Sequence, residues 1–302
     1  MSADSGADRE PLVNDLWDYS APAESEARLR TALAAAPPGS DQAVELLTQI
    51  ARAQGLQRTF AAAHATLDAA QAALRPAQRR ATIRYLLERG RVFNSAGEPA
   101  RAEPLFLEAW QLAQSAGEDF YAVDAAHMVA IVASPAQAIK WNLRAMNLAE
   151  ASADPRTRGW LGPLYNNLGW TYHDLARYDE ALALFEKGLA LHKAASQLAE
   201  MRIAQWAVAR TFRSLGRVAA ALASQQDLAA ELEESGEQDG YVDEELGECF
   251  LALGNPAAAA AHFARAAQLL GEDPWLVANE PARLDRLRTL ANPGATPNGS
   301  LL

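Results

Sequence analysis

Residues 165–191 read YNNLGWTYHDLARYDEALALFEKGLAL, and this stretch decides the fold. Large and small side chains recur there at the spacing of one helical face, on either side of a break near residues 176–177. The first face carries Tyr165, Leu168, Gly169 and Tyr172, and the second carries Tyr178, Ala181, Phe185 and Leu189. Gly169 and Ala181 are small where two helices would touch, and Tyr172 and Phe185 fill the space beside them. The stretch therefore predicts two antiparallel helices packed together.

This pattern resembles the tetratricopeptide repeat (TPR), in which a large residue, Leu-Gly and Tyr in one helix precede Ala, an aromatic residue and Ala in the next. The resemblance implies an all-α fold, a right-handed superhelical solenoid of antiparallel helix pairs. It also implies a concave groove that binds a peptide segment of a partner protein.

Weaker copies of the pattern flank the central one, so we predict about six TPR-like units with helical caps. Their small second-helix positions are placed at residues 60, 102, 138, 181, 221 and 259. Gly97, Gly216 and Gly254 stand where the first helix of a pair must end. The predicted organisation is a flexible segment at 1–23, the repeat array at 24–271, and a capping helix with a disordered tail at 272–302. Residues 24–36 would form an N-terminal capping helix, and Leu12, Val13, Leu16 and Trp17 would dock on the first repeat.

Composition narrows the function. Half of the 302 residues are hydrophobic and 22% are charged, which predicts a folded chain. The net charge of −11 disfavours nonspecific nucleic-acid binding, which relies on Lys and Arg. The polar N-terminus and the lack of an 18-residue apolar run predict a soluble, cytoplasmic protein with no membrane insertion.

The predicted groove is lined by first-helix residues one position after the packing ones, because one residue rotates a side chain by about 100°. This offset selects Asn166, Trp170 and His173 in the central repeat. In the other repeats it selects Arg84, Arg91, Asn94, His127, Trp206, Arg210 and Arg213. Trp and Arg are enriched at binding hot spots, and Arg and Asn would hold carboxylates or a peptide backbone. The alternative is that these long side chains merely cover the helix surface.

Other sites are weaker. We find no catalytic motif and predict no metal or cofactor, so enzymatic activity stays undecided. Asp124 and His127 have the spacing of a hydrogen-bonded pair on a helix surface, and Cys249 is predicted to be a buried apolar residue rather than a nucleophile beside His262. In chaperone-binding TPR proteins lysines form a carboxylate clamp; here Leu87 and Trp206 occupy those positions, which argues against a receptor for chaperone tails.

The leading hypothesis is an interaction scaffold or adaptor that binds a peptide segment of a protein partner in the groove. The alternatives are a regulatory sensor of a peptide or small effector, and an enzyme with a central Trp/His/Arg pocket. Arginines crowd residues 75–91 and acids crowd residues 231–248. Either these are two solvated faces, or they drive head-to-tail self-association into a homo-oligomer or create an electrostatic field across the superhelix.

Overall fold

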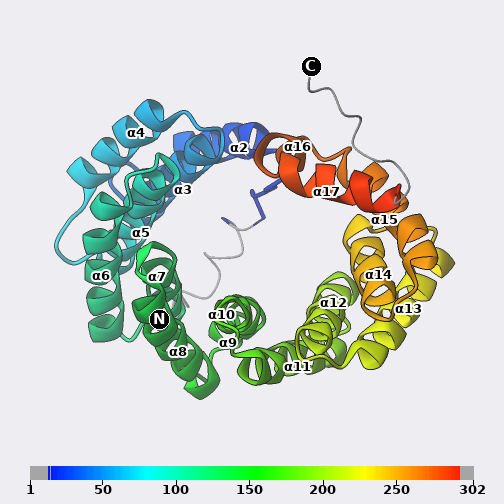
Figure 1. Cartoon of the computed structure of the whole chain (residues 1–302). Coiled ribbons are helices and arrows are strands. Elements are labelled where there is room, and N and C mark those ends of the chain that lie inside the picture. The colour runs from blue at the N-terminus through cyan, green and yellow to red at the C-terminus, as the bar shows by residue number, and fades with distance from the viewer. Residues whose placement is uncertain (1–12, 14, 293–302) are drawn as a thin grey trace. The chain divides into compact units, whose positions relative to one another are not determined.

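The computed structural model describes residue 13 and residues 15–292, which form helices joined by short turns, with no strand among them. Two compact units meet in the chain between Leu164 and Tyr165, a division that the sequence does not predict. Within each unit, helices that follow one another in the chain lie side by side (Figure 1).

The helices of the first unit, in chain order, are α2 (Pro22–Ala35), α3 (Asp41–Leu56), α4 (Phe60–Ala73), α5 (Arg79–Ser95), α6 (Pro99–Ala116), α7 (Asp119–Val132), α8 (Pro135–Ala151) and the short α9 (Pro155–Arg158). Helix α10 (Leu161–Asp174) begins four residues before the division. The second unit continues with α11 (Tyr178–Ala194), α12 (Leu198–Ser214), α13 (Val218–Ser235), α14 (Gly240–Ala252), α15 (Pro256–Leu270), α16 (Pro274–Asn279) and α17 (Pro281–Ala291). The fold class is the predicted one, an all-α helical-repeat fold built from packed helix pairs.

The core repeats one contact. A Cβ on Gly169 would lie 2.5 Å from the ring of Phe185, and a Cβ on Gly247 would lie 2.8 Å from the ring of Phe263. Gly90 meets Phe106 in the same way. Each pair joins the two helices of one repeat and is separated by the same number of residues. Only a residue without a side chain lets the aromatic ring approach the first helix so closely.

The same two positions can be followed through every repeat. The first-helix position is occupied by Ala51, Gly90, Ala130, Gly169, Ala209 and Gly247, all of them buried, at intervals of 38 to 40 residues. The second-helix position is occupied by Leu67, Phe106, Met146, Phe185, Gln225 and Phe263, also all buried. The repeat is therefore nearly uniform in length, and its helices of 13 to 18 residues explain the long period.

Two predicted positions were wrong. The small second-helix residues of the first and third repeats are not Phe60 and Ala138, which are only half-buried. They are Ala63, with no exposed surface, and Asn142, which is 5% exposed. In α4 and α8 the position that Phe106, Phe185 and Phe263 occupy in other repeats holds Leu67 and Met146, so no aromatic residue there fixes the register and the sequence pattern slips by about one helical turn.

The ends of the array are also covered. Val13 is buried, and Leu16 and Trp17 pack with it on α2 and α3, as predicted. At the other end α17 buries Leu284 and Leu287 against the cluster around Phe263, but Trp275, within the segment predicted as the cap, is 60% exposed. Leu12 and the predicted disordered tail from residue 293 lie outside the described residues.

Candidate functional site

A row of three aromatic side chains runs along the first helices of the second unit. Trp170 on α10 lies beside Trp206 on α12, with ring centroids 5.7 Å apart, and Trp206 lies 6.0 Å from Tyr241 on α14. The Trp206 Nε1–H donates to the Tyr241 carbonyl at 3.0 Å, and the Trp170 Nε1–H donates to Asn166 Oδ1 at 3.2 Å. All three rings are half-buried, so each keeps an exposed edge. We call Trp170, Trp206 and Tyr241 the aromatic row.

The polar residues predicted beside this row make contacts within the chain. His173 lies 2.9 Å from the Ser214 hydroxyl, and both Arg210 and Arg213 donate to Glu245 of α14. Burial alone would raise the pKa of Glu245, but hydrogen bonds and positive charge from these two arginines hold that pKa below its ordinary value. Burial, aided by the charge of Arg210, lowers the pKa of His173. Both arginines are therefore already paired with a carboxylate of the chain itself, that of Glu245.

The predicted residues of the first unit are paired in the same manner. Arg84 donates to Glu45 at 3.3 Å and to the Tyr121 hydroxyl at 3.0 Å. Arg91 donates to Glu88 at 2.8 Å and also to Asp124. The partners belong to α3, α5 and α7, so the first helices of successive repeats are linked by ion pairs.

Three further predictions concern this unit. The predicted hydrogen bond between Asp124 and His127 is wrong, because Asp124 accepts from Arg91 and Nδ1 of His127 has no partner in the described part of the chain. The His127 ring lies 5.4 Å from that of Trp160. Asn94 lines a small cleft of about 210 Å³ with Arg91. Leu87, placed in the groove by its offset, is only 1% exposed and belongs to the core.

Sequence reasoning missed two clefts of the second unit. The first, which we call the Trp206 cleft, has a volume of about 590 Å³. It is lined by Leu198, Ala199, Arg202, Ile203, Trp206, Leu228, Leu232, Glu237, Asp239 and Tyr241. Leu198 and Ile203 are 53% and 59% exposed, although both are aliphatic. Apolar residues at the spacing 199, 203 and 206 on one face of α12 are the signal that would have indicated this cleft.

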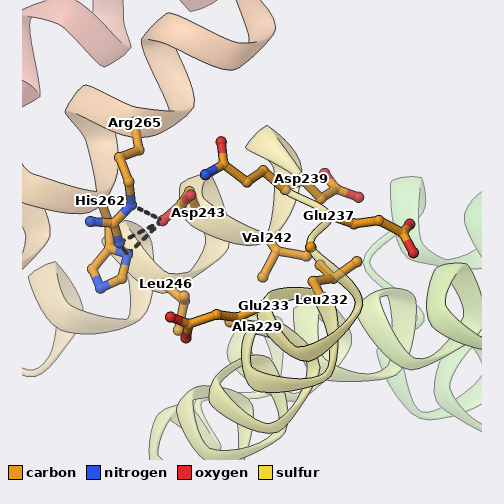
Figure 2. A pocket seen from close by; sticks show the side chains of 12 residues that line it. Ala229, Leu232, Glu233, Glu237, Asp239, Val242, Asp243, Leu246, His262 and Arg265 are labelled. Carbon is orange, nitrogen blue, oxygen red and sulfur yellow. Dashed lines mark hydrogen bonds and ion pairs between the residues drawn. The ribbon is translucent and has the colours of Figure 1, made fainter.

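The second cleft, which we call the Asp243 cleft, measures about 510 Å³ and lies between α13, α14 and α15 (Figure 2). Asp243 lies 2.7 Å from Nδ1 of His262 and accepts from Arg265 at 3.0 Å. Burial would raise the pKa of Asp243, but hydrogen bonds from His262 and Arg265 lower it, so this carboxyl is ionised at neutral pH. Glu233 is exposed at the edge of the same cleft.

Cys249 behaves as the buried apolar residue that we predicted. It has no exposed surface, and burial raises the pKa of its thiol to about 11. His262 makes its contacts with Asp243 and Arg265. Among the described residues, no three His, Cys, Asp or Glu side chains gather as metal ligands would. None of the described helices is long and apolar enough to cross a bilayer.

Comparison with known proteins agrees with this geometry. Residues 164–197 match the family model of the tetratricopeptide repeat. No curated protein sequence matches the chain. The apo form of RapI has a similar structure, with a TM-score of 0.70 and 11% identity over 93% of this chain and 80% of RapI. The apo form of the quorum sensor NprR from B. thuringiensis gives a TM-score of 0.63 and 14% identity, over 96% of this chain and 84% of NprR.

NprR in complex with its cognate peptide NprX gives a TM-score of 0.54 and 13% identity, over 97% of this chain and 86% of NprR. At these identities the likeness establishes the fold alone. Together with the matched repeat and the recurring glycine–aromatic contact, it shows that this chain has a fold of the tetratricopeptide-repeat type, with residues 164–197 matching one such repeat.

Proposed function

We propose that this chain is a binding module that holds a segment of a partner protein against the aromatic row and the Trp206 cleft of its second unit. The observation that carries the proposal is the open, largely aliphatic and aromatic cleft of about 590 Å³ beside Trp206. No described residue covers Leu198 or Ile203 there, and exposed aliphatic side chains next to half-buried tryptophans are typical of a partner surface.

The structural relatives support this proposal. A similar fold holds a peptide in the NprR complex with NprX. The sequence hypothesis that arginines of the groove hold a ligand carboxylate is less favoured, because Arg84, Arg91, Arg210 and Arg213 already pair with acids of this chain. Recognition would then rest on the aromatic and aliphatic surface, with Asn166, His173, Asn94 and His127 as secondary predictions.

A sensor of a small effector is the second candidate. The Trp206 cleft has the volume of typical small-molecule sites, which is about 300–1,000 Å³. Nothing in the geometry favours an enzyme. Three statements stay predictions from the sequence: that the chain binds no nucleic acid, that it self-associates, and that it is located in the cytoplasm.

The test is a selection of random 12-residue peptides, displayed on phage, against the full chain. We expect enriched peptides to bind the wild type and to lose binding to Trp206→Ala, provided that circular dichroism shows the variant to be folded. Trp275→Ala is the matched control, because Trp275 is 60% exposed and lies outside both clefts. Failure to enrich any peptide, or equal binding to Trp206→Ala, would contradict the proposal. If peptides fail, a thermal-shift screen of small metabolites against the same variants tests the sensor.

A further inference from the structure

The turn between α13 and α14 stands at the junction of the two clefts. Leu232, Glu237 and Asp239 belong to the lining of both the Trp206 cleft and the Asp243 cleft, so the two are contiguous across residues 236–239. The chain thus presents two adjoining surfaces of different chemistry.

The Trp206 cleft is suited to an apolar side chain. Its floor is made by Leu228 and Leu232, which are 1% and 8% exposed, and Trp206 and Tyr241 stand beside them. The exposed Ile203 gains most from being covered, because the free energy gained on burial grows with the apolar area removed from water. Arg202, the cation of this cleft, is already paired with Glu237 at 2.9 Å.

The Asp243 cleft carries excess negative charge. Four carboxylates line the two clefts, namely Glu233, Glu237, Asp239 and Asp243, against the two arginines Arg202 and Arg265. Both arginines form ion pairs within the chain, Arg202 with Glu237 and Arg265 with Asp243.

In the described part of the chain Glu233 makes no ion pair, and Asp239 only caps α14 by accepting the Tyr241 N–H at 2.8 Å. Two carboxylates of the Asp243 cleft are therefore without a cation, Asp239 at the junction and Glu233 at the edge of the cleft on α13.

We propose that the bound segment carries an apolar residue close to a lysine or arginine. The apolar side chain enters the Trp206 cleft, and the cation crosses the 236–239 turn into the Asp243 cleft, which Asp239 lines at the turn and Glu233 lines from α13. This inference rests on the proposed function and assigns its ligand a basic rather than an acidic character. The sequence had instead suggested an acidic ligand held by arginines of the first helices, but those arginines form ion pairs within the chain.

The test uses the random 12-residue phage library on the full chain. We expect the enriched pool to carry net positive charge, with Lys or Arg within about three residues of a large apolar residue. A synthetic copy of the leading clone is then compared by fluorescence anisotropy with versions whose basic residues are changed to Ser or Glu. Replacement by Glu should weaken binding about tenfold or more, and the difference should shrink at 0.5 M NaCl.

Two pairs of variants locate the contacts. Ile203→Ser should weaken binding of the peptide about tenfold. Ile131→Ser, at a residue 51% exposed in the first unit, should leave the affinity unchanged. Glu233→Gln should reduce the preference for basic over Ser versions up to about fivefold, whereas Glu186→Gln, an exposed position on α11, should not.

An acidic or neutral pool, or peptides that depend on Trp206 but not on Ile203 and Glu233, would overturn this inference while leaving the proposed function standing. A library from which nothing is enriched would overturn both.

Discussion

A single contact, the one between Gly169 and Phe185, sets how closely the helices of the central repeat approach. A Cβ at residue 169 would lie 2.5 Å from Cε1 of Phe185, whose ring is 2% exposed and has nowhere to move. Gly169→Ala would gain about 1 kcal/mol of helix propensity but pay about 1–3 kcal/mol or more for overpacking. We expect Gly169→Ala to lower the free energy of unfolding by up to about 2 kcal/mol, as measured by urea denaturation.

Gly188 on α11 provides the matched control. Its nearest neighbour to an added Cβ is the Cβ of Tyr165 at 3.8 Å, an ordinary contact. Gly188→Ala should therefore stabilise the protein by about 0.5–1 kcal/mol through helix propensity alone. If both alanine variants shift stability in the same direction, the close approach at Gly169 is not the cause.

His127 connects stability to pH. Burial, with the charge of Arg91 acting in the same direction, lowers its pKa below the ordinary 6.5. Above pH 6.5 the ring is neutral in both the folded and unfolded states, so it contributes no pH dependence. Below pH 6.5 the unfolded chain takes up a proton that the folded chain resists, and stability falls as the pH falls. The lowered pKa values of His64 and His173 act in the same sense.

We expect the free energy of unfolding, followed by urea titration, to decrease between pH 7.5 and pH 5.5. His127→Gln should make that decrease smaller, because Gln has no proton to gain. A variant with the same slope as the wild type would show that the His127 ring is protonated as readily in the folded chain as in the unfolded one.

At the scale of the element, the turns that end the first helices share one backbone conformation. Gly97, Gly216 and Gly254 have φ between +75° and +82°, as their position at helix ends predicted, and Ala176 takes the same place in the central repeat with φ of +57°. A left-handed conformation costs a residue with a Cβ about 1–2 kcal/mol. Ala176→Gly should therefore raise the midpoint of thermal unfolding, corresponding to a gain of about 0.5–1 kcal/mol.

Ala96 is the neighbouring position of an equivalent turn and has φ of −80°. Ala96→Gly should lower the midpoint, because glycine there only adds flexibility to the unfolded chain. Stabilisation by both variants would mean that the effect is not tied to the left-handed conformation of residue 176.

The sequence predicts helices well where aromatic and glycine residues alternate, as in residues 165–191. It fails where alanine fills both faces of a helix, since α4 then offers several equivalent registers and Phe60 was chosen over Ala63. The first-helix ion pairs were also missed, because Arg84 and Glu45 are 39 residues apart and Arg213 and Glu245 are 32 apart. Opposite charges on first helices one repeat apart are the signal that would have predicted them.

Only part of the aromatic row could be predicted. Trp170 and Trp206 were both selected from the sequence by the same offset on successive first helices, and their rings lie 5.7 Å apart. The clefts could not be foreseen, because they depend on how far α12, α13 and α14 separate and on the course of the 236–239 turn. Such distances are set by the packing of several side chains together, and no local pattern encodes them.

At the scale of the whole molecule, the uneven distribution of charge has an internal use. Early arginines meet acids of neighbouring helices, as in Arg80 with Glu118 and Arg89 with Asp68. Late acids meet arginines in the same way, as in Glu244 with Arg283 and Glu248 with Arg286. These pairs leave less charge for head-to-tail association than the sequence suggests, and the net −11 opposes it further.

We expect the stability of each repeat to depend mainly on the repeats next to it in the chain. The main helix contacts join elements adjacent in the chain or next but one, and the core cluster around Phe106 lies in the first unit while that around Phe263 lies in the second. In such an array each repeat depends on its neighbours, and distant repeats are coupled weakly. Phe263→Ala, at a residue with no exposed surface, should cost about 3–5 kcal/mol locally.

Hydrogen–deuterium exchange with mass spectrometry would resolve this distribution. We expect Phe263→Ala to accelerate amide exchange in α14, α15 and α17 while α5 and α6 keep their wild-type protection, because local opening requires only the damaged neighbourhood to unfold. Phe106→Ala should produce the reverse pattern, with exchange accelerated in α5 and α6 and unchanged in α14 and α15. Equal acceleration along the whole chain in both variants would instead show a single cooperative unit, in which the division at residue 164 has no energetic meaning.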